Sequence, residues 1–106
     1  MPEFYNYIDG KWVPALSGKT MESRNPANGE LIGAVPYSGR EDVLRAVEAA
    51  DRAFEKWRKT PAPRRAELIH RASDLLRERK QYMGELLTRE MGKVLKEGLG
   101  DIQEAI

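Results

Sequence analysis

The order of hydrophobic and polar positions changes about a third of the way along the chain, from strand-like segments to a helical repeat. Aromatic and β-prone residues occupy residues 4–8 and 11–14, on either side of Asp9-Gly10. An Asp-Gly pair favours a type I′ turn, because both central residues of that turn need positive φ. The pattern therefore predicts a first β-hairpin here.

A second hairpin is predicted from residues 20–24 and 30–35, joined by Asn25-Pro26-Ala27-Asn28-Gly29. Pro26 presets a turn value of φ, and Asn28-Gly29 can supply left-handed positions. We interpret this segment as a structural turn rather than a ligand-binding loop.

From residue 38 the apolar spacing is helical. Ser38-Gly39-Arg40-Glu41 has the form of a capping box, with Ser38 as the N-cap and Glu41 at the third helical position. The residues that follow repeat at steps of four and three, which predicts one apolar helix face: Val43, Val47, Ala50, Phe54 and Trp57.

Three further helices are predicted. The second begins at Pro61, capped by Thr60, and runs to about Lys80; the third spans Tyr82 to Met91, and the fourth begins near Val94. Gly98 and Gly100 each weaken the fourth helix by about 1 kcal/mol relative to alanine. Close packing against another element would explain both glycines.

The predicted fold class is α/β, with β-hairpins over residues 1–37 and amphipathic helices over residues 38–106. The fourth apolar stripe continues to Ile106 without a stop signal, and the pattern contains no central sheet for the helices to cover. Both observations predict that this chain is part of a larger fold.

Composition limits the function classes. The 106 residues fit one small domain, and 18 Lys and Arg against 17 Asp and Glu give a net charge of +1, too small to favour nucleic acid or membrane surfaces. No apolar run approaches the roughly 20 residues that span a bilayer, and no signal peptide is recognisable. The absence of cysteine excludes thiolate chemistry within this chain. A cytoplasmic location is expected.

Two glycine motifs fail on spacing. Ser17-Gly18-Lys19-Thr20 resembles the end of a phosphate-binding loop, but Val13 stands where that motif needs glycine. Gly98-Leu99-Gly100 would begin a dinucleotide fingerprint, but Gln103 replaces its third glycine.

The arginines of the second helix alternate with acidic residues, which indicates paired surface charge. No catalytic constellation is visible, and a free-standing helical interaction module and a small nucleic-acid binder remain alternative functions.

Six segments occur in the order and spacing of a known family: YIDGKWV, SGKT, NPANGELIGAVP, REDVLRAVEAADRAFEKWRKTP, RAELIHRASDLLRERK and LLTREMGK. Together they resemble the N-terminal segment of NAD(P)-dependent aldehyde dehydrogenases, from about Tyr7 to Ile106. The tail EMGKVLKEGLGDIQEAI further resembles the antiquitin-like, α-aminoadipic semialdehyde branch.

The resemblance implies that residues 1–106 are the N-terminal part of a coenzyme-binding domain, without the catalytic domain. The parent enzyme would be an oxidoreductase that converts an aldehyde to a carboxylic acid with NAD or NADP. Its nucleophilic cysteine, base and cofactor contacts would lie elsewhere, so no catalytic or cofactor-binding residue is assigned here and the chain alone is expected to be inactive. The implied partners are the remainder of the chain and further copies in a homo-oligomer, with neither nucleic acid nor membrane.

One ancillary site follows from the same resemblance. Some family members bind a monovalent cation through backbone carbonyls before the NPANG turn and an acidic residue before GK, which match Ser23, Arg24 and Glu90. Arg24 stands where an aliphatic residue is common, but only its carbonyl would be used. The alternative is that Glu90 pairs with Arg24 or Lys93.

Overall fold

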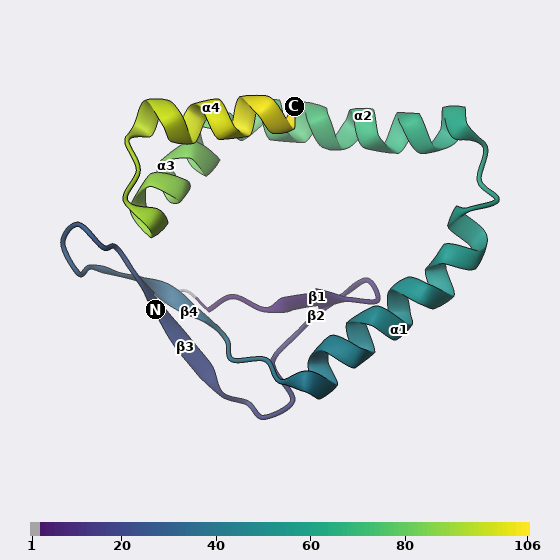
Figure 1. Ribbon diagram of the computed structural model, residues 1–106, viewed down its shortest axis with the longest axis horizontal. Helices are drawn as coiled ribbons and strands as arrows, with labels where there is room; N and C mark the ends of the chain where they lie inside the picture. The colour runs from purple at the N-terminus through teal and green to yellow at the C-terminus, as the bar shows by residue number, and fades with distance from the viewer. Residues whose placement is uncertain (1–2) are drawn as a thin grey trace. The chain divides into compact units, whose positions relative to one another are not determined.

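The computed structural model describes residues 3–106, which form four short strands followed by four helices (Figure 1). The strands are β1 (Asn6–Ile8), β2 (Lys11–Val13), β3 (Thr20–Arg24) and β4 (Leu31–Pro36). The helices are α1 (Arg40–Trp57), α2 (Ala62–Glu78), α3 (Lys80–Met91) and α4 (Leu95–Ala105). Hairpins followed by helices confirm the predicted α/β class.

The chain divides into two compact units. The first contains the residues up to Ser23 together with Leu31–Thr60, and the second contains Arg24–Glu30 and Pro61–Ile106. The turn of the second hairpin therefore belongs with α2, α3 and α4, whereas most of β3 and all of β4 belong with α1.

The first hairpin has the predicted turn. β1 and β2 pair antiparallel, with Tyr7 opposite Trp12, and the two rings lie with their centroids 4.8 Å apart. Asp9 and Gly10 adopt φ of 52° and 75°, the left-handed values that a type I′ turn needs. Both strands are shorter than predicted.

The turn of the second hairpin differs from the predicted one at Asn28. Gly29 has positive φ, at 75°, but Asn28 is not among the described residues with positive φ. Asn28 instead accepts a hydrogen bond from Glu30 N on its side-chain oxygen at 2.9 Å, and Asn25 does the same for Ala27 N at 2.9 Å. Side-chain acceptors thus stabilise a turn for which two left-handed residues were expected.

Strand β4 lies at the centre of the first unit. It contributes the buried residues Ile32, Gly33 and Ala34, and Ala34 O accepts a hydrogen bond from Phe4 N at 2.9 Å. β3 pairs with the same strand. The buried core of this unit is small, since Ala15 is the other buried apolar residue among residues 3–60.

Two predicted helix starts are wrong by one residue. The N-cap of α1 is Gly39 rather than Ser38, and the N-cap of α2 is Pro61 rather than Thr60. The Thr60 hydroxyl donates to Lys56 O at 3.0 Å, so it stabilises the end of α1 and not the start of α2. The predicted second helix also ends earlier, at Glu78, and the third helix begins earlier, at Lys80 rather than Tyr82.

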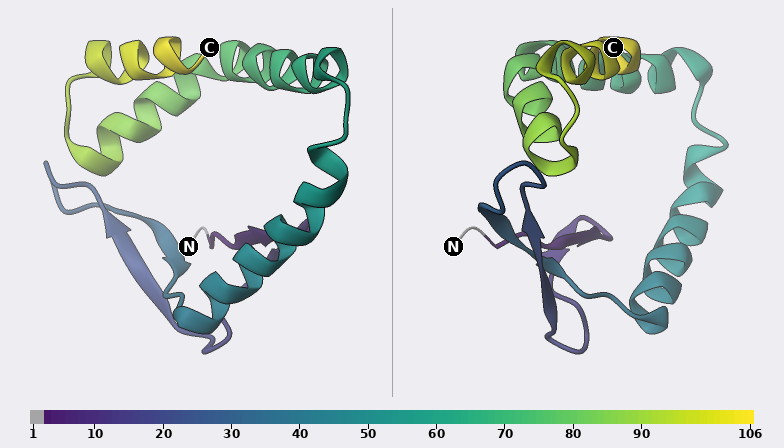
Figure 2. Two further views of the ribbon diagram at one scale, coloured as in Figure 1. Left: turned by 45° about the vertical axis from the view of Figure 1, so that its right-hand side comes forward. Right: turned by 60° about the vertical axis from the view of Figure 1, so that its left-hand side comes forward.

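The second unit is organised around the packing of α3 against α4, which lie side by side in both views of Figure 2. A Cβ built on Gly98 would lie 2.9 Å from Gly84 O, and one built on Gly84 would lie 2.6 Å from Leu99 Cδ2. The predicted close packing is confirmed for Gly98. It is wrong for Gly100, which has no neighbouring atom within 4 Å of such a Cβ.

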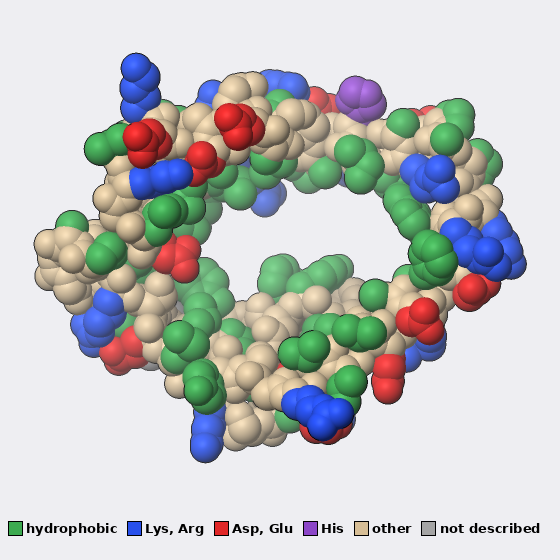
Figure 3. Space-filling view, viewed as in Figure 1, with side chains coloured by type: hydrophobic (Ala, Val, Ile, Leu, Met, Phe, Trp, Pro, Cys, Tyr) green, Lys and Arg blue, Asp and Glu red, His purple; other side chains and the backbone are tan. Residues whose placement is uncertain are grey.

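Large apolar side chains remain uncovered on the helices of each unit (Figure 3). On α1 the predicted stripe is exposed by 58% at Val47 and 54% at Phe54, and Ile69 on α2 is exposed by 65%. Apolar surface of this extent is typical of a protein interface. Among residues 3–106, no helix is long and apolar enough to cross a membrane.

Candidate functional site

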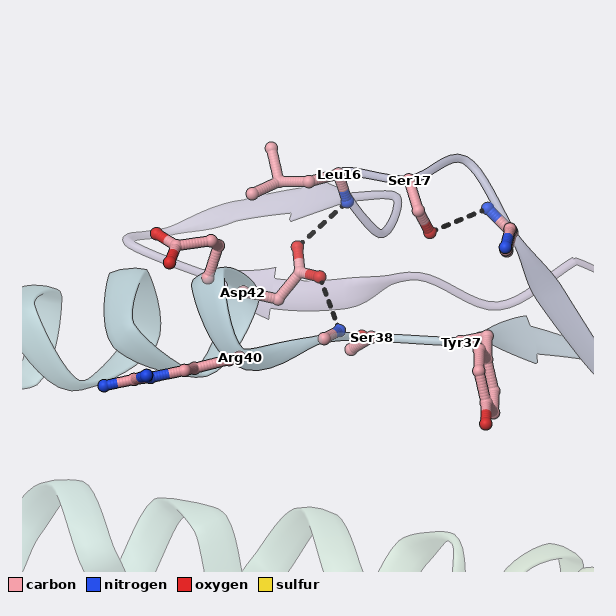
Figure 4. A pocket seen from close by; sticks show the side chains of 9 residues that line it. Leu16, Ser17, Tyr37, Ser38, Arg40 and Asp42 are labelled. Atoms are coloured by element: carbon pink, nitrogen blue, oxygen red, sulfur yellow. Dashed lines mark hydrogen bonds between the residues drawn. The ribbon is translucent and has the colours of Figure 1, made fainter.

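A buried carboxylate lies at the start of α1. Asp42 is only 6% exposed and accepts hydrogen bonds from Leu16 N and Gly39 N, each at 2.9 Å (Figure 4). The backbone N–H groups of Gly39 and then of Leu16 hold the pKa of Asp42 below its ordinary value, because they stabilise the charged form. Asp42 thus fastens the loop after β2 to the helix.

Beside Asp42 is an open pocket of about 470 Å³, whose polar lining includes Ser17, Lys19 and Arg40. The Ser17 hydroxyl accepts a hydrogen bond from Lys19 N at 3.2 Å, and both oxygens of the Asp42 carboxylate accept backbone N–H groups (Figure 4). These contacts organise the loop and the helix start. We therefore assign the pocket a structural role.

The helix-capping acid is Asp42, one residue after the predicted Glu41. Glu41 is exposed, and Asp42, at the third helical position, receives the N-cap amide of Gly39. Both residues are acidic and both lie in the first turn. The spacing of Asp42 from Gly39 was a signal in the sequence, but Ser38 as the apparent N-cap pointed to Glu41 instead.

Neither of the two glycine motifs has the backbone setting of a nucleotide-binding loop. Gly18 has φ of 67° and the chain continues directly into β3, whereas a phosphate-binding loop opens a helix. Gly98 and Gly100 both lie inside α4, whereas a dinucleotide fingerprint forms the turn between a strand and a helix.

Two of the four arginines of α2 form the ion pairs with acidic neighbours that the sequence indicated. Arg64 contacts Glu67 at 2.6 Å, and Arg77 contacts Asp74 at 2.7 Å. Exposed pairs of this kind contribute little stability.

The predicted cation ligands lie at two element ends. Ser23 and Arg24 are the last residues of β3, and Glu90 is exposed in the last turn of α3. Arg24 and Glu90 belong to the second unit, whereas Ser23 belongs to the first. The structure therefore brings two of the three residues into one compact unit.

Within the second unit, the turn Arg24–Glu30 contacts the end of α3. Arg89 Nη2 lies 3.8 Å from Glu30 Oε1, and a Cβ built on Gly92 would lie 3.0 Å from Pro26 Cγ. The guanidinium of Arg24 donates to Gly29 O at 3.0 Å. These contacts bring the turn that follows Arg24 next to the helix end that carries Glu90.

Lys93, one partner considered for Glu90, pairs with Asp101. The hydrogen bond to the Asp101 carboxylate raises the pKa of Lys93. Among residues 3–106, no three His, Cys, Asp or Glu side chains come together as a metal cluster. The predicted site needs only one carboxylate, because its other ligands would be carbonyls.

Comparison with known proteins decides the family. A model of the aldehyde dehydrogenase family matches residues 12–106, which is most of the chain. The chain belongs to the aldehyde dehydrogenase family. The resemblance found in the sequence is thereby confirmed.

Similar proteins agree with this assignment. Malonate-semialdehyde dehydrogenase 2 of Geobacillus kaustophilus is 46% identical over 101 residues, which cover 95% of this chain and 21% of that protein. Malonate-semialdehyde dehydrogenase 1 of Geobacillus thermodenitrificans is 48% identical with the same coverage. The chain thus spans about a fifth of the length of these relatives. Membership of the antiquitin-like branch stays a prediction.

Solved structures show the same fold. The structure of 3,6-anhydro-L-galactose dehydrogenase in complex with NAP matches with a TM-score of 0.92 and 34% identity, over 96% of this chain and 21% of that one. NADP-dependent glyceraldehyde-3-phosphate dehydrogenase from Bacillus halodurans, complexed with NADP, gives a TM-score of 0.92 and 30% identity, over 97% of this chain and 22% of that one.

Proposed function

We propose that this family member is the N-terminal part of the coenzyme-binding domain of an NAD(P)-dependent aldehyde dehydrogenase, an oxidoreductase that converts an aldehyde to a carboxylic acid. The observation that carries the proposal is the TM-score of 0.92 to a dehydrogenase in complex with NAP, at 34% identity. In this proposal residues 1–37 supply the hairpins, residues 38–106 supply the helices, and the catalytic domain lies in the remainder of the protein.

The role of this part is structural support. Exposed apolar residues on α1, such as Val47 and Phe54, and on α2, such as Ile69, are suited to pack against the remainder of the enzyme. Assembly into a homo-oligomer and a cytoplasmic location belong to the same proposal, since they rest on the family resemblance.

Two positions of this chain are unsuited to hold a dinucleotide. The Gly98-Leu99-Gly100 segment is helical, and the carboxylate beside the pocket at the start of α1 is occupied by two backbone amides. NAD(P) would therefore be held by the remainder of the enzyme. We assign no chemical step to a residue of this chain.

We expect the full-length protein to oxidise aldehydes with NAD⁺ or NADP⁺, and the chain alone to show neither oxidation nor specific binding of either nucleotide. The reason is that this chain has no cysteine and no dinucleotide loop. Calorimetric titration of both proteins and an absorbance assay for reduced cofactor check this. Micromolar binding by the chain alone, or a full-length protein inactive on every aldehyde, would contradict the proposal.

The second part of the proposal is a monovalent cation site formed by the Ser23 and Arg24 carbonyls and the Glu90 carboxylate. Its physical support is the end of α3, where the last helical carbonyls carry partial negative charge and Glu90 adds a full one. A site with a single carboxylate favours a monovalent over a divalent ion, because a divalent ion needs more charge compensation.

We expect the full-length protein to melt at a higher temperature in K⁺ or Na⁺ than in a bulky organic cation of equal ionic strength, and the Glu90→Gln variant to lose most of that difference. Glu85→Gln is the matched control, since Glu85 is an exposed carboxylate on the same helix. Differential scanning fluorimetry gives the melting temperatures. A wild type insensitive to the ion, or a Glu90→Gln variant with the full effect, would rule the site out.

A further inference from the structure

The end of α3 and the turn of the second hairpin meet at two residues that are far apart in the sequence. Gly92 caps the helix with φ of 80°, and a Cβ at this position would lie 3.0 Å from Pro26 Cγ and 4.0 Å from Pro26 Cβ. A separation of 3.0 Å is tighter than ordinary van der Waals contact. The close approach of the proline ring to the helix end therefore depends on glycine at this position.

The turn that carries Pro26 is internally rigid. Gly29 N donates to Asn25 O at 2.8 Å, and the Asn25 and Asn28 side chains accept the backbone amides of Ala27 and Glu30. A turn fixed by three hydrogen bonds moves as one body. Its position against α3 consequently sets the position of the residues at its ends, Arg24 among them.

We infer that Gly92 and Pro26 are positioning residues. Their close contact fixes the second-hairpin turn against the end of α3, and so places the Arg24 carbonyl where it can bind the same cation as the Glu90 carboxylate. The inference rests on the proposed cation site. Pro26 lies two residues after Arg24, and Gly92 lies two residues after Glu90. The Arg89–Glu30 pair, at 3.8 Å, lies between the same two segments.

A matched control separates this contact from backbone strain. Gly10 has φ of 75°, close to that of Gly92, but a Cβ there would meet no heavy atom within 4 Å. Gly10→Ala and Gly92→Ala both force alanine into the left-handed region, where L-residues are strained. Only Gly92→Ala also pushes against Pro26.

The test is a K⁺ titration of the melting temperature of the full-length protein, with four variants: Gly92→Ala, Gly10→Ala, Pro26→Ala, and the double variant of Gly92 and Pro26. We expect Gly92→Ala to raise the K⁺ concentration for half-maximal stabilisation by roughly 10-fold or more, as for other supports of metal ligands. Gly10→Ala should lower the melting temperature but leave that K⁺ concentration unchanged. Pro26→Ala removes the Cγ atom, so the double variant should recover towards the wild-type value.

Three results would overturn the inference: an unchanged K⁺ midpoint in Gly92→Ala, an equal shift in Gly10→Ala, or a double variant no better than Gly92→Ala. A wild type without K⁺ dependence would remove the cation site, and the positioning role with it. In that case the melting temperatures still decide whether the contact exists, because additive effects of Gly92→Ala and Pro26→Ala would show that the two residues do not touch.

Discussion

Replacement of Gly98 by alanine is expected to destabilise the α3–α4 pair by about 1–3 kcal/mol, the usual cost of forcing an extra methyl group into a packed contact. The added Cβ would lie 2.9 Å from Gly84 O and 3.1 Å from Thr88 Oγ1. A backbone carbonyl inside a helix cannot move aside without breaking the hydrogen bonds of its turn. The two helices would therefore have to separate.

The same helix provides the control. Gly100→Ala adds the same methyl group where no atom lies within 4 Å, so it should be neutral or stabilise the helix by up to about 1 kcal/mol. Gly84→Ala should fall between the two, because its nearest neighbour is the flexible end of the Leu99 side chain.

Thermal melts of the chain followed by circular dichroism, or of the full-length protein if the chain alone does not melt cooperatively, measure all three substitutions. Gly100→Ala is expected to be the most stable of the three variants, Gly84→Ala intermediate, and Gly98→Ala the least stable. A Gly98→Ala variant as stable as Gly100→Ala would show that α3 and α4 do not cross at these glycines.

Asp42→Asn is expected to destabilise the first unit more than any substitution of its exposed neighbours. The carboxylate accepts two backbone N–H groups, from Leu16 and from Gly39, each at 2.9 Å. An amide has one oxygen, so one of these donors would face an NH₂ group and lose its partner. The loop after β2 and the start of α1 should then separate.

Glu41→Gln removes the same charge from the same helix turn, but Glu41 is exposed and is not the capping residue. Any effect through the helix dipole is common to both variants. Hydrogen exchange of the Leu16 and Gly39 amides should accelerate in Asp42→Asn and stay slow in Glu41→Gln. Equal acceleration in both variants would support the capping register that the sequence first indicated.

The pH dependence of this difference has a definite sign. The folded-state pKa of Asp42 is lowered, so its stabilising effect is complete above the unfolded-state pKa and is lost as the pH falls through the folded value. Wild type and Asp42→Asn should therefore differ most near neutral pH and converge below about pH 4. A difference that persists undiminished at lower pH would contradict this assignment.

The sequence determined the features that depend on neighbours along the chain. The Asp9-Gly10 turn was predicted with its type, because only a few residues tolerate positive φ. The apolar repeat predicted the ends of the helices to within about two residues. Six segments in the right order indicated the family. Local backbone chemistry and residue spacing are readable without a structure.

Tertiary structure decided the features that depend on which distant atoms come close. Glu41 and Asp42 both place a carboxylate in the first turn of α1, and the sequence alone favoured Glu41. The amides of Gly39 and of Leu16, the second of which reaches α1 only after folding, donate to Asp42 and identify it as the capping residue. Gly98 and Gly100 lie in the same helix, and only the crossing with α3 distinguishes them. The close approach of Pro26 to Gly92 cannot be predicted from the neighbours of either residue, because proline is common in turns and glycine is common at helix ends. Only the packing of the folded chain brings these two residues together.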